Sequence, residues 1–272
     1  FSAVINDNNK TGYLSHLITL DMGDMGMVGF DQGVGEFGAS TIDDKSPTAW
    51  EESWHNTANS SGGLVHSGGS GGVLGYSNSV GGFDLTVEYA PALTTADNGD
   101  GGAGGDNTSL ANGSNINFAI NNSSLIDGLA FGVGAGESEY DDESIVGHEN
   151  GSSSVAYANY TMGSITAGIT ISDSANTRSA TAVDTNTGGR EVEAYGVSMA
   201  VNDNLSISYN EHNMTYRKAG AGPDVEQQST GIAIAYTMGG ATLAIQNNSM
   251  DNVTGTSGTN DEITEISLSL AF

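Results

Sequence analysis

The final stretch of the chain, DEITEISLSLAF (residues 261–272), has the pattern of an amphipathic β-strand. Successive side chains of a strand point to opposite faces of the sheet. One face of this stretch would carry Thr264, Ile266, Leu268, Leu270 and Phe272. The other face would carry Ile263, Glu265, Ser267, Ser269 and Ala271. Any half-buried strand can look like this, so the fold depends on how often the pattern recurs.

The same alternation recurs along the whole chain. We predict strands at residues 12–22, 26–32, 73–80, 83–92, 115–123, 128–137, 153–162, 164–173, 191–201, 204–215, 228–238, 241–250 and 262–272. In the strand at 83–92, for example, Phe83, Leu85 and Val87 alternate with Asp84, Thr86 and Glu88. The alternation defines the two faces of each strand, but it leaves open which face points inward.

The connections between these strands alternate in length. Short links rich in Gly, Asn and Asp, such as Gly81–Gly82 and Gly239–Gly240, are typical of tight turns. The other links are long, and the longest covers residues 33–72. Strictly alternating short and long links are typical of a transmembrane β-barrel, whose apolar face contacts lipid and whose polar face lines a lumen. A soluble sandwich places its apolar faces inward and would not sort its loops in this way.

Composition is consistent with this all-β interpretation. The 272 residues include 40 Gly and 33 acidic against 6 basic side chains, which gives a formal net charge of −27. No apolar run is long enough for a transmembrane helix. Phosphate binding requires a basic face, so nucleic acid is excluded as a partner. The excess of acids favours cations as partners.

The terminal strand resembles the closing strand of bacterial outer-membrane barrels, and the complete chain resembles a Gram-negative general porin. Residues 37–54, FGASTIDDKSPTAWEESW, resemble the constriction loop that folds into the pore of that family. The resemblance implies one porin domain over residues 1–272, with 33–72 as the constricting loop and Phe272 as part of the assembly signal. It further implies a non-enzymatic, homotrimeric diffusion channel, integral to the outer membrane, in contact with lipopolysaccharide and passing small hydrophilic solutes.

The strand count departs from the family pattern. Porins of this kind have sixteen strands, five of them before the constriction loop, whereas only two of our thirteen precede residues 33–72. Single-chain bacterial barrels have even strand numbers. We therefore expect about three further strands, or roughly 40–70 residues, ahead of Phe1.

Charged residues at the pore are the candidates for function, because fixed charges and pore width decide what passes. For the constriction and its selectivity we predict Glu36, Asp43, Asp44, Lys45, Glu51 and Glu52. For the pore wall we predict Asp21, Asp31, Asp84, Glu88 and Glu265. Together they would favour cations, although each one could also be an ordinary solvated charge. No ladder of basic residues opposes them in the predicted strands.

Several alternatives remain open at this stage. Asp97, Asp100 and Asp106 are weak candidates for a Ca²⁺ site in an external loop, because carboxylate oxygens suit that ion. A flexible acidic loop explains these residues better. No other cofactor is expected. Trp50 and Trp54 would form a sugar rail in a substrate-specific channel, or would hold the loop against the wall, which we favour. A barrel enzyme would require a catalytic cluster, and a surface adhesin a short repeat; neither is recognisable.

Overall fold

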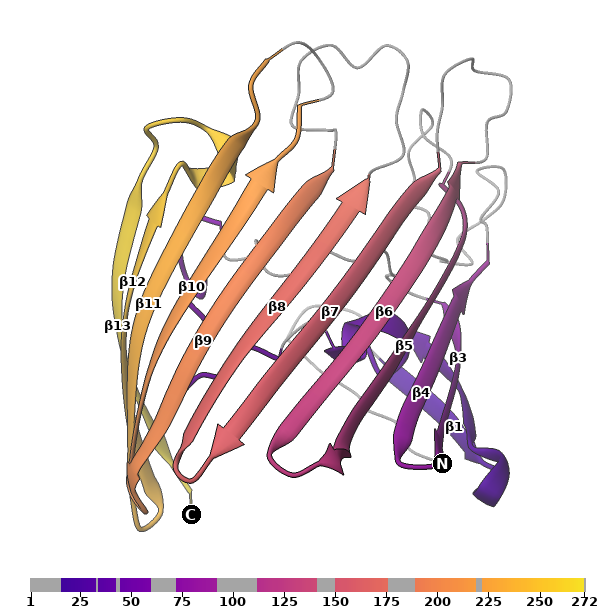
Figure 1. Cartoon of the computed structure of the whole chain (residues 1–272), viewed down its shortest axis with the longest axis horizontal. Helices are drawn as coiled ribbons and strands as arrows, with labels where there is room; N and C mark the ends of the chain where they lie inside the picture. Colours follow the sequence, from indigo (N-terminus) through magenta and orange to yellow (C-terminus); the bar gives the residue numbers. More distant parts are fainter. Residues whose placement is uncertain are drawn as a thin grey trace.

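The computed structural model describes residues 16–32, 34–42, 45–59, 72–91, 112–140, 150–175, 189–218 and 222–271. These residues form one antiparallel sheet in which each strand pairs with the next one along the chain (Figure 1). The strands are β1 (His16–Asp21), β2 (Met27–Gln32), β3 (Val73–Val80), β4 (Phe83–Ala90), β5 (Asn112–Ile126), β6 (Leu129–Tyr140), β7 (Gly151–Met162), β8 (Ile165–Ala175), β9 (Arg190–Asn202), β10 (Leu205–Tyr216), β11 (Val225–Met238), β12 (Ala241–Asp251) and β13 (Asp261–Leu270). Three short 3-10 helices are η1 (Gly23–Met25), η2 (Gly38–Ile42) and η3 (Val253–Gly255).

All thirteen predicted strands are confirmed, most of them to within a few residues at each end. Within the described residues, β1 and β13 pair with one neighbour each and form the two edges of the sheet. No helix in the described ranges is long and apolar enough to cross a membrane. Phe272 lies outside the described residues, so its predicted part in assembly stays a prediction.

Short turns connect the strands at one end of the sheet, at the bottom of Figure 1. The β3–β4 turn consists of Gly81 and Gly82, with φ angles of +60° and +85°. Two consecutive positive φ angles suit the tight hairpin turn whose twist matches the flanking strands, and glycine adopts them without a steric penalty.

One predicted turn is wrong. The predicted strands 115–123 and 128–137 implied a turn over residues 124–127, but β5 continues to Ile126 and its pairing with β6 shifts register between Asn122 and Ile126. The Oδ1 atom of the buried Asn122 accepts hydrogen bonds from the backbone N–H groups of Ser124 and Leu125. A side chain therefore holds this irregularity within the strand, which the alternation pattern could not show.

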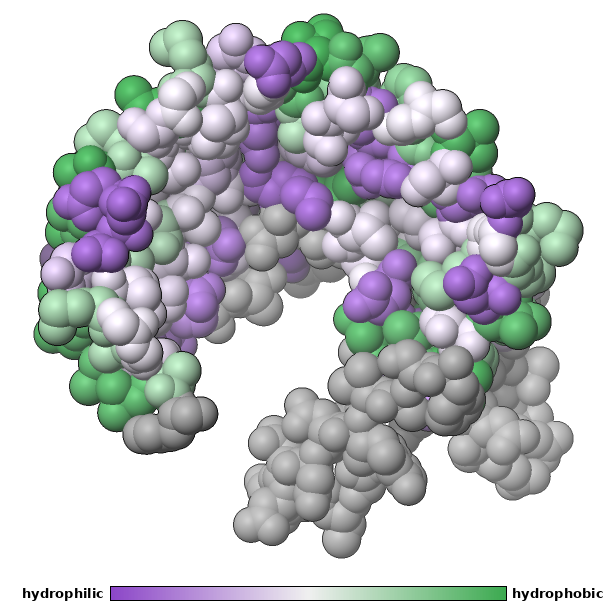
Figure 2. All heavy atoms as spheres, turned by 90° about the horizontal axis from the view of Figure 1, so that it is seen from below, coloured by the Kyte–Doolittle hydropathy of each residue, from purple (hydrophilic) through white to green (hydrophobic). Residues whose placement is uncertain are grey.

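The apolar face of the sheet is its convex, exposed face. Figure 2 shows a curved wall with its hydrophobic side chains gathered on the outside and polar ones on the inside. In the middle of the wall, Ile207, Ile234, Ile245 and Ile266 are paired across four consecutive strands. Ile266 is 68% exposed. A continuous apolar surface of this extent is unsuited to water and typical of contact with lipid.

The concave face is polar. Its side chains include Asn117, Asn210, His212, Gln227, Gln246 and Asn248, each with 2% or less of its surface exposed. This arrangement inverts the usual distribution of a soluble domain, in which buried side chains are mainly apolar. Small apolar clusters lie where residues between β2 and β3 cover the wall, as around Ile42 and Trp54. The sheet therefore has the two faces of a transmembrane barrel, and the question left open by the alternation is settled.

Candidate pore constriction

The described parts of the predicted constriction loop, residues 34–42 and 45–59, lie against the concave face of the sheet, and we call them the inner loop. Glycines on the strands make room for it. A Cβ atom on Gly75 of β3 would lie 2.0 Å from the ring of Phe37. Gly168 and Gly196 are paired on β8 and β9, and a Cβ on either would come within 2.9 Å of Pro47. The path of the inner loop thus follows positions on the wall that lack side chains.

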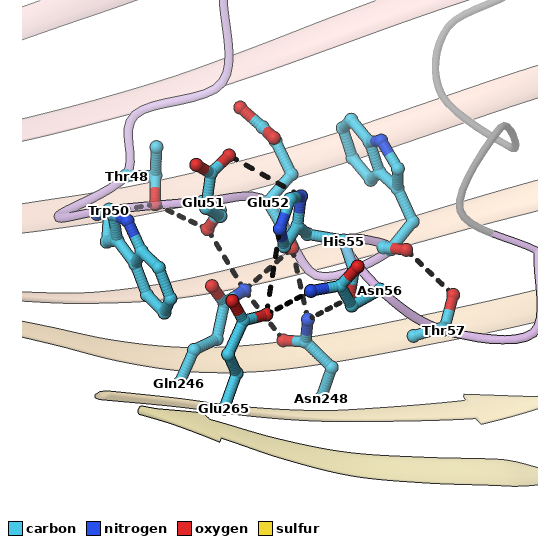
Figure 3. Close-up of polar contacts among 11 residues, drawn as sticks. Thr48, Trp50, Glu51, Glu52, His55, Asn56, Thr57, Gln246, Asn248 and Glu265 are labelled. Atoms are coloured by element: carbon cyan, nitrogen blue, oxygen red, sulfur yellow. Dashed lines mark hydrogen bonds and ion pairs between the residues drawn. The ribbon is translucent and has the colours of Figure 1, made fainter. Parts of the chain in front are cut away.

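Side-chain amides of the wall hold the inner loop by its backbone. Asn159 of β7 donates to the carbonyl oxygen of Lys45 at 2.6 Å, and Asn210 of β10 donates to that of Pro47 at 2.8 Å. On β12, Gln246 donates to the carbonyl oxygens of Glu51 and Glu52, and Asn248 to those of Glu52 and His55 (Figure 3). Buried amides need hydrogen-bond partners. These contacts therefore position the loop and also satisfy the buried amide groups of the wall.

A carboxylate fixes the beginning of the inner loop. Asp31, at the end of β2, accepts hydrogen bonds from the backbone N–H groups of Val34, Gly35 and Glu36 at 2.7 to 2.9 Å. Only 1% of Asp31 is exposed. Charge-assisted bonds to three N–H groups are strong, so Asp31 acts on the loop backbone and is shielded from the open lumen.

Four other carboxylates meet around a cavity of about 700 Å³ at the short-turn end of the concave face. Asp21 is the last residue of β1, Asp24 lies in the β1–β2 connection, Glu36 in the inner loop and Asp84 in β4. We call this space the acidic mouth. Among the described residues that line it, none is a lysine or arginine. Several uncompensated carboxylates in a concave space produce a potential that attracts cations.

A second polar group lies at the other end of the inner loop. His55 lies between two carboxylates: its Nδ1 is 3.6 Å from Glu51, and its Nε2 is 3.6 Å from Glu265 of β13 (Figure 3). Asn56 also donates a hydrogen bond to Glu265. About a third of the His55 side chain is exposed, so the group is accessible from the lumen. We call Glu51, His55 and Glu265 the histidine cluster.

Comparison with known proteins shows the fold. The sequence matches no protein-family model, and no curated protein is significantly similar to it. Solved structures match over almost the whole chain. A loop-deletion mutant of OmpT, an outer membrane protein of Vibrio cholerae, aligns over 98% of this chain and 82% of its own, with a TM-score of 0.66 and 12% identity. The OmpF of Salmonella typhi, in complex with daunomycin, aligns over 94% and 78% with a TM-score of 0.61 and 14% identity. The fold is that of an outer-membrane porin.

An anion-selective porin from Comamonas acidovorans has the same fold, with a TM-score of 0.58 over 99% of this chain and 82% of its own, at 12% identity. Charge selectivity therefore has to be argued from the side chains of each porin and not from the fold. A pore that favours anions needs basic side chains on its wall, and the described strands of this chain are poor in them. In the described strands Arg190, the first residue of β9, is the one lysine or arginine, and its guanidinium lies 5.3 Å from the ring centre of Tyr216.

Of the other described bases, Lys45 lies in the inner loop, and Arg217 and Lys218 directly follow β10. Arg217, just after β10, is paired with Asp173 and Glu191. Its hydrogen bond to Asp173 holds the pKa of Arg217 above its ordinary value, against the lowering effect of partial burial. Because this arginine is neutralised by its own partners, it does not oppose the lumen carboxylates.

The predicted site residues fall into five groups. Asp21, Glu36 and Asp84 come together at the acidic mouth, and Glu51 and Glu265 in the histidine cluster. Asp31 and Glu88 face the concave side but are covered, with 1% and 4% of their surface exposed. Lys45 and Glu52 lie in the inner loop with their backbone carbonyls bonded to the wall. Asp43, Asp44, Asp97, Asp100 and Asp106 lie outside the described residues.

Sequence reasoning missed the wall amides and His55. The amides occupy the inward positions of the strands, as the alternation predicts for polar residues. The repeated choice of Asn and Gln at these positions could have indicated them, because a wall that contacts only water does not require side chains that donate hydrogen bonds to a loop. For His55 the only local signal was Glu51, four residues earlier in the same loop; its second partner, Glu265, lies on a strand more than 200 residues away.

Proposed function

We propose that this chain is an integral outer-membrane porin, a non-enzymatic, water-filled channel that passes small hydrophilic solutes and ions by passive diffusion and prefers cations. The observation that carries the proposal is the inverted sheet, apolar outside and polar inside, with an inner loop bound to its concave face. A barrel that merely anchored a surface domain would not need a loop held along its lumen by amides from several strands.

The preference for cations is supported by the acidic mouth. Its four carboxylates, Asp21, Asp24, Glu36 and Asp84, face no lysine or arginine among the described residues that line the cavity. Fixed negative charge in a narrow, water-filled passage lowers the free energy of cations and raises that of anions. The homotrimeric state and the contact with lipopolysaccharide remain part of the proposal on the strength of the sequence resemblance.

A sugar-specific channel with a two-tryptophan rail is less well supported. Trp54 is only 9% exposed and packs with Met250 and Val253. It holds the inner loop against the wall, as we favoured from the sequence. Trp50 is partly exposed, and one tryptophan is too little for a row of stacked sugar contacts.

Planar-bilayer recording tests the proposal. We expect large ohmic openings in steps of three, and a reversal potential in a KCl gradient that shows cation preference. The triple variant D21N/E36Q/D84N should reduce that preference. The control E139Q/E226Q/E262Q removes the same number of charges from exposed positions on the convex face and should leave selectivity unchanged. Folded, inserted protein without conductance would overturn the channel, and unchanged selectivity in the lumen variant would overturn the assignment of the mouth.

A further inference from the structure

We propose that His55 is a selectivity-determining residue of the pore, and that its protonation tunes the preference for cations. This inference rests on the proposed channel function. It follows from the position of the imidazole between a carboxylate of the inner loop and a carboxylate of the wall strand β13 (Figure 3).

The charge of the His55 ring depends on how many of its two nitrogens carry a proton. A neutral imidazole has one N–H donor and one acceptor nitrogen, whereas an imidazolium has two N–H donors. In this structure both ring nitrogens of His55 face carboxylate oxygens, Nδ1 that of Glu51 and Nε2 that of Glu265, each at 3.6 Å. These distances are longer than hydrogen bonds, and each contact becomes an ion pair when the ring is protonated. Histidine is also the side chain whose charge ordinarily changes between about pH 5 and pH 8.

The surroundings of His55 are acidic or uncharged. The inner loop contributes Glu51 and Glu52, and β13 contributes Glu265 and Asp261, whose carboxylate accepts a hydrogen bond from the backbone of Ala58. The strand between, β12, presents the uncharged amides Gln246 and Asn248 to the loop backbone. No lysine or arginine is paired with Glu51 or Glu265 within the described ranges.

The charge of His55 therefore decides the net charge of the cluster. With both carboxylates ionised, protonated His55 leaves the cluster at −1, and neutral His55 leaves it at −2. Side chains of the cluster are about one-third exposed, so permeating ions sense this charge. A more negative wall favours cations, so the cation preference rises as the pH rises through the range in which histidine loses its proton.

Reversal potentials in a KCl gradient at about pH 5.5 and about pH 8 test this, since carboxylates stay mostly ionised at both values. For the wild-type protein we expect the ratio of cation to anion permeability to rise by about twofold at the higher pH, because the cluster then carries one more negative charge. The variant H55N, uncharged throughout, should give the high-pH ratio at both values. The variant H55K, charged throughout, should give the low-pH ratio at both.

Two further variants keep the test decisive. His16 lies on β1 beside Phe30, on the convex side of the wall, so H16N should retain the full pH response. E265Q makes the cluster less negative and should lower the cation preference at both pH values while the response to pH remains. The inference is overturned if H55N responds to pH like the wild-type protein. If wild-type protein does not conduct, or shows no cation preference at pH 8, the proposed function fails instead.

Discussion

Trp54 of the inner loop and His212 of β10 form a tilted ring contact between loop and wall, with ring centroids 4.5 Å apart and planes inclined by 49°. Both rings are almost completely buried. This contact joins residues far apart in the chain and fixes the distal half of the inner loop against the concave face.

The first prediction concerns this contact. W54A should free the distal part of the inner loop, because truncating a buried aromatic side chain costs about 3–5 kcal/mol. We expect a lower melting temperature and larger, noisier single-channel conductance. W50A is the matched control: Trp50 lies outside the buried cluster of Trp54, Met250 and Val253, so its loss should leave the melting temperature nearly unchanged. Equal effects of the two substitutions would contradict the assigned role of Trp54.

The second prediction concerns the glycines beneath the inner loop. G75A places a methyl group 2.0 Å from the Phe37 ring and should destabilise the folded protein by about 1–3 kcal/mol, as overpacking does. If the cause is this contact, the penalty should largely disappear in the F37A background. Urea denaturation of the four proteins in lipid vesicles measures the coupling, and additive effects would exclude the contact as the cause.

The third prediction distinguishes the roles of Asp31 and Asp21, which the sequence analysis assigned to the same pore wall. D31N replaces an acceptor oxygen by an NH₂ group facing backbone N–H donors, and should cost about 1–3 kcal/mol for the donors left unpaired. Hydrogen exchange of the amides of Val34, Gly35 and Glu36 should accelerate. D21N, in the acidic mouth, should instead reduce cation selectivity with little effect on stability, because its one described bond is to the exposed N–H of Gly23. The reverse pattern would show that the two roles are misassigned.

The fourth prediction tests which face contacts lipid. Ile266 lies on the exposed convex face of β13, and Ser267 on the opposite face. I266K should destabilise the inserted protein by about 2–4 kcal/mol, the cost of lysine near the bilayer midplane. S267K should be tolerated and should shift ion selectivity toward anions. Folding yields in vesicles and reversal potentials measure both effects, and a tolerated I266K would be inconsistent with a lipid-facing position.

The sequence predicted the strands well because their signals are local. Alternation with a period of two residues and turns of glycine, asparagine and aspartate depend on neighbours in the chain. The error at residues 124–127 has a local cause as well, since Asn122 stabilises an irregularity with its own side chain. Acidic residues of the lumen could be predicted as a class, because charge and parity along a strand are visible in the sequence.

Exposure of individual carboxylates could not be predicted in this way. Asp31 and Asp84 occupy equivalent inward positions, yet Asp31 is covered by the inner loop and Asp84 lines the acidic mouth. The difference depends on the path of the loop, which is fixed by contacts between residues far apart in the chain. Asn210 and Pro47, for example, are separated by 163 positions.

The sequence alone thus determined an antiparallel sheet with one apolar and one polar face, because alternation is a property of the extended backbone. The tertiary structure decided which face is concave, where the inner loop runs, which acids stay open to the lumen and how His55 meets Glu51 and Glu265. These features depend on the curvature of the sheet and on packing between distant segments, for which a single sequence carries no local signal.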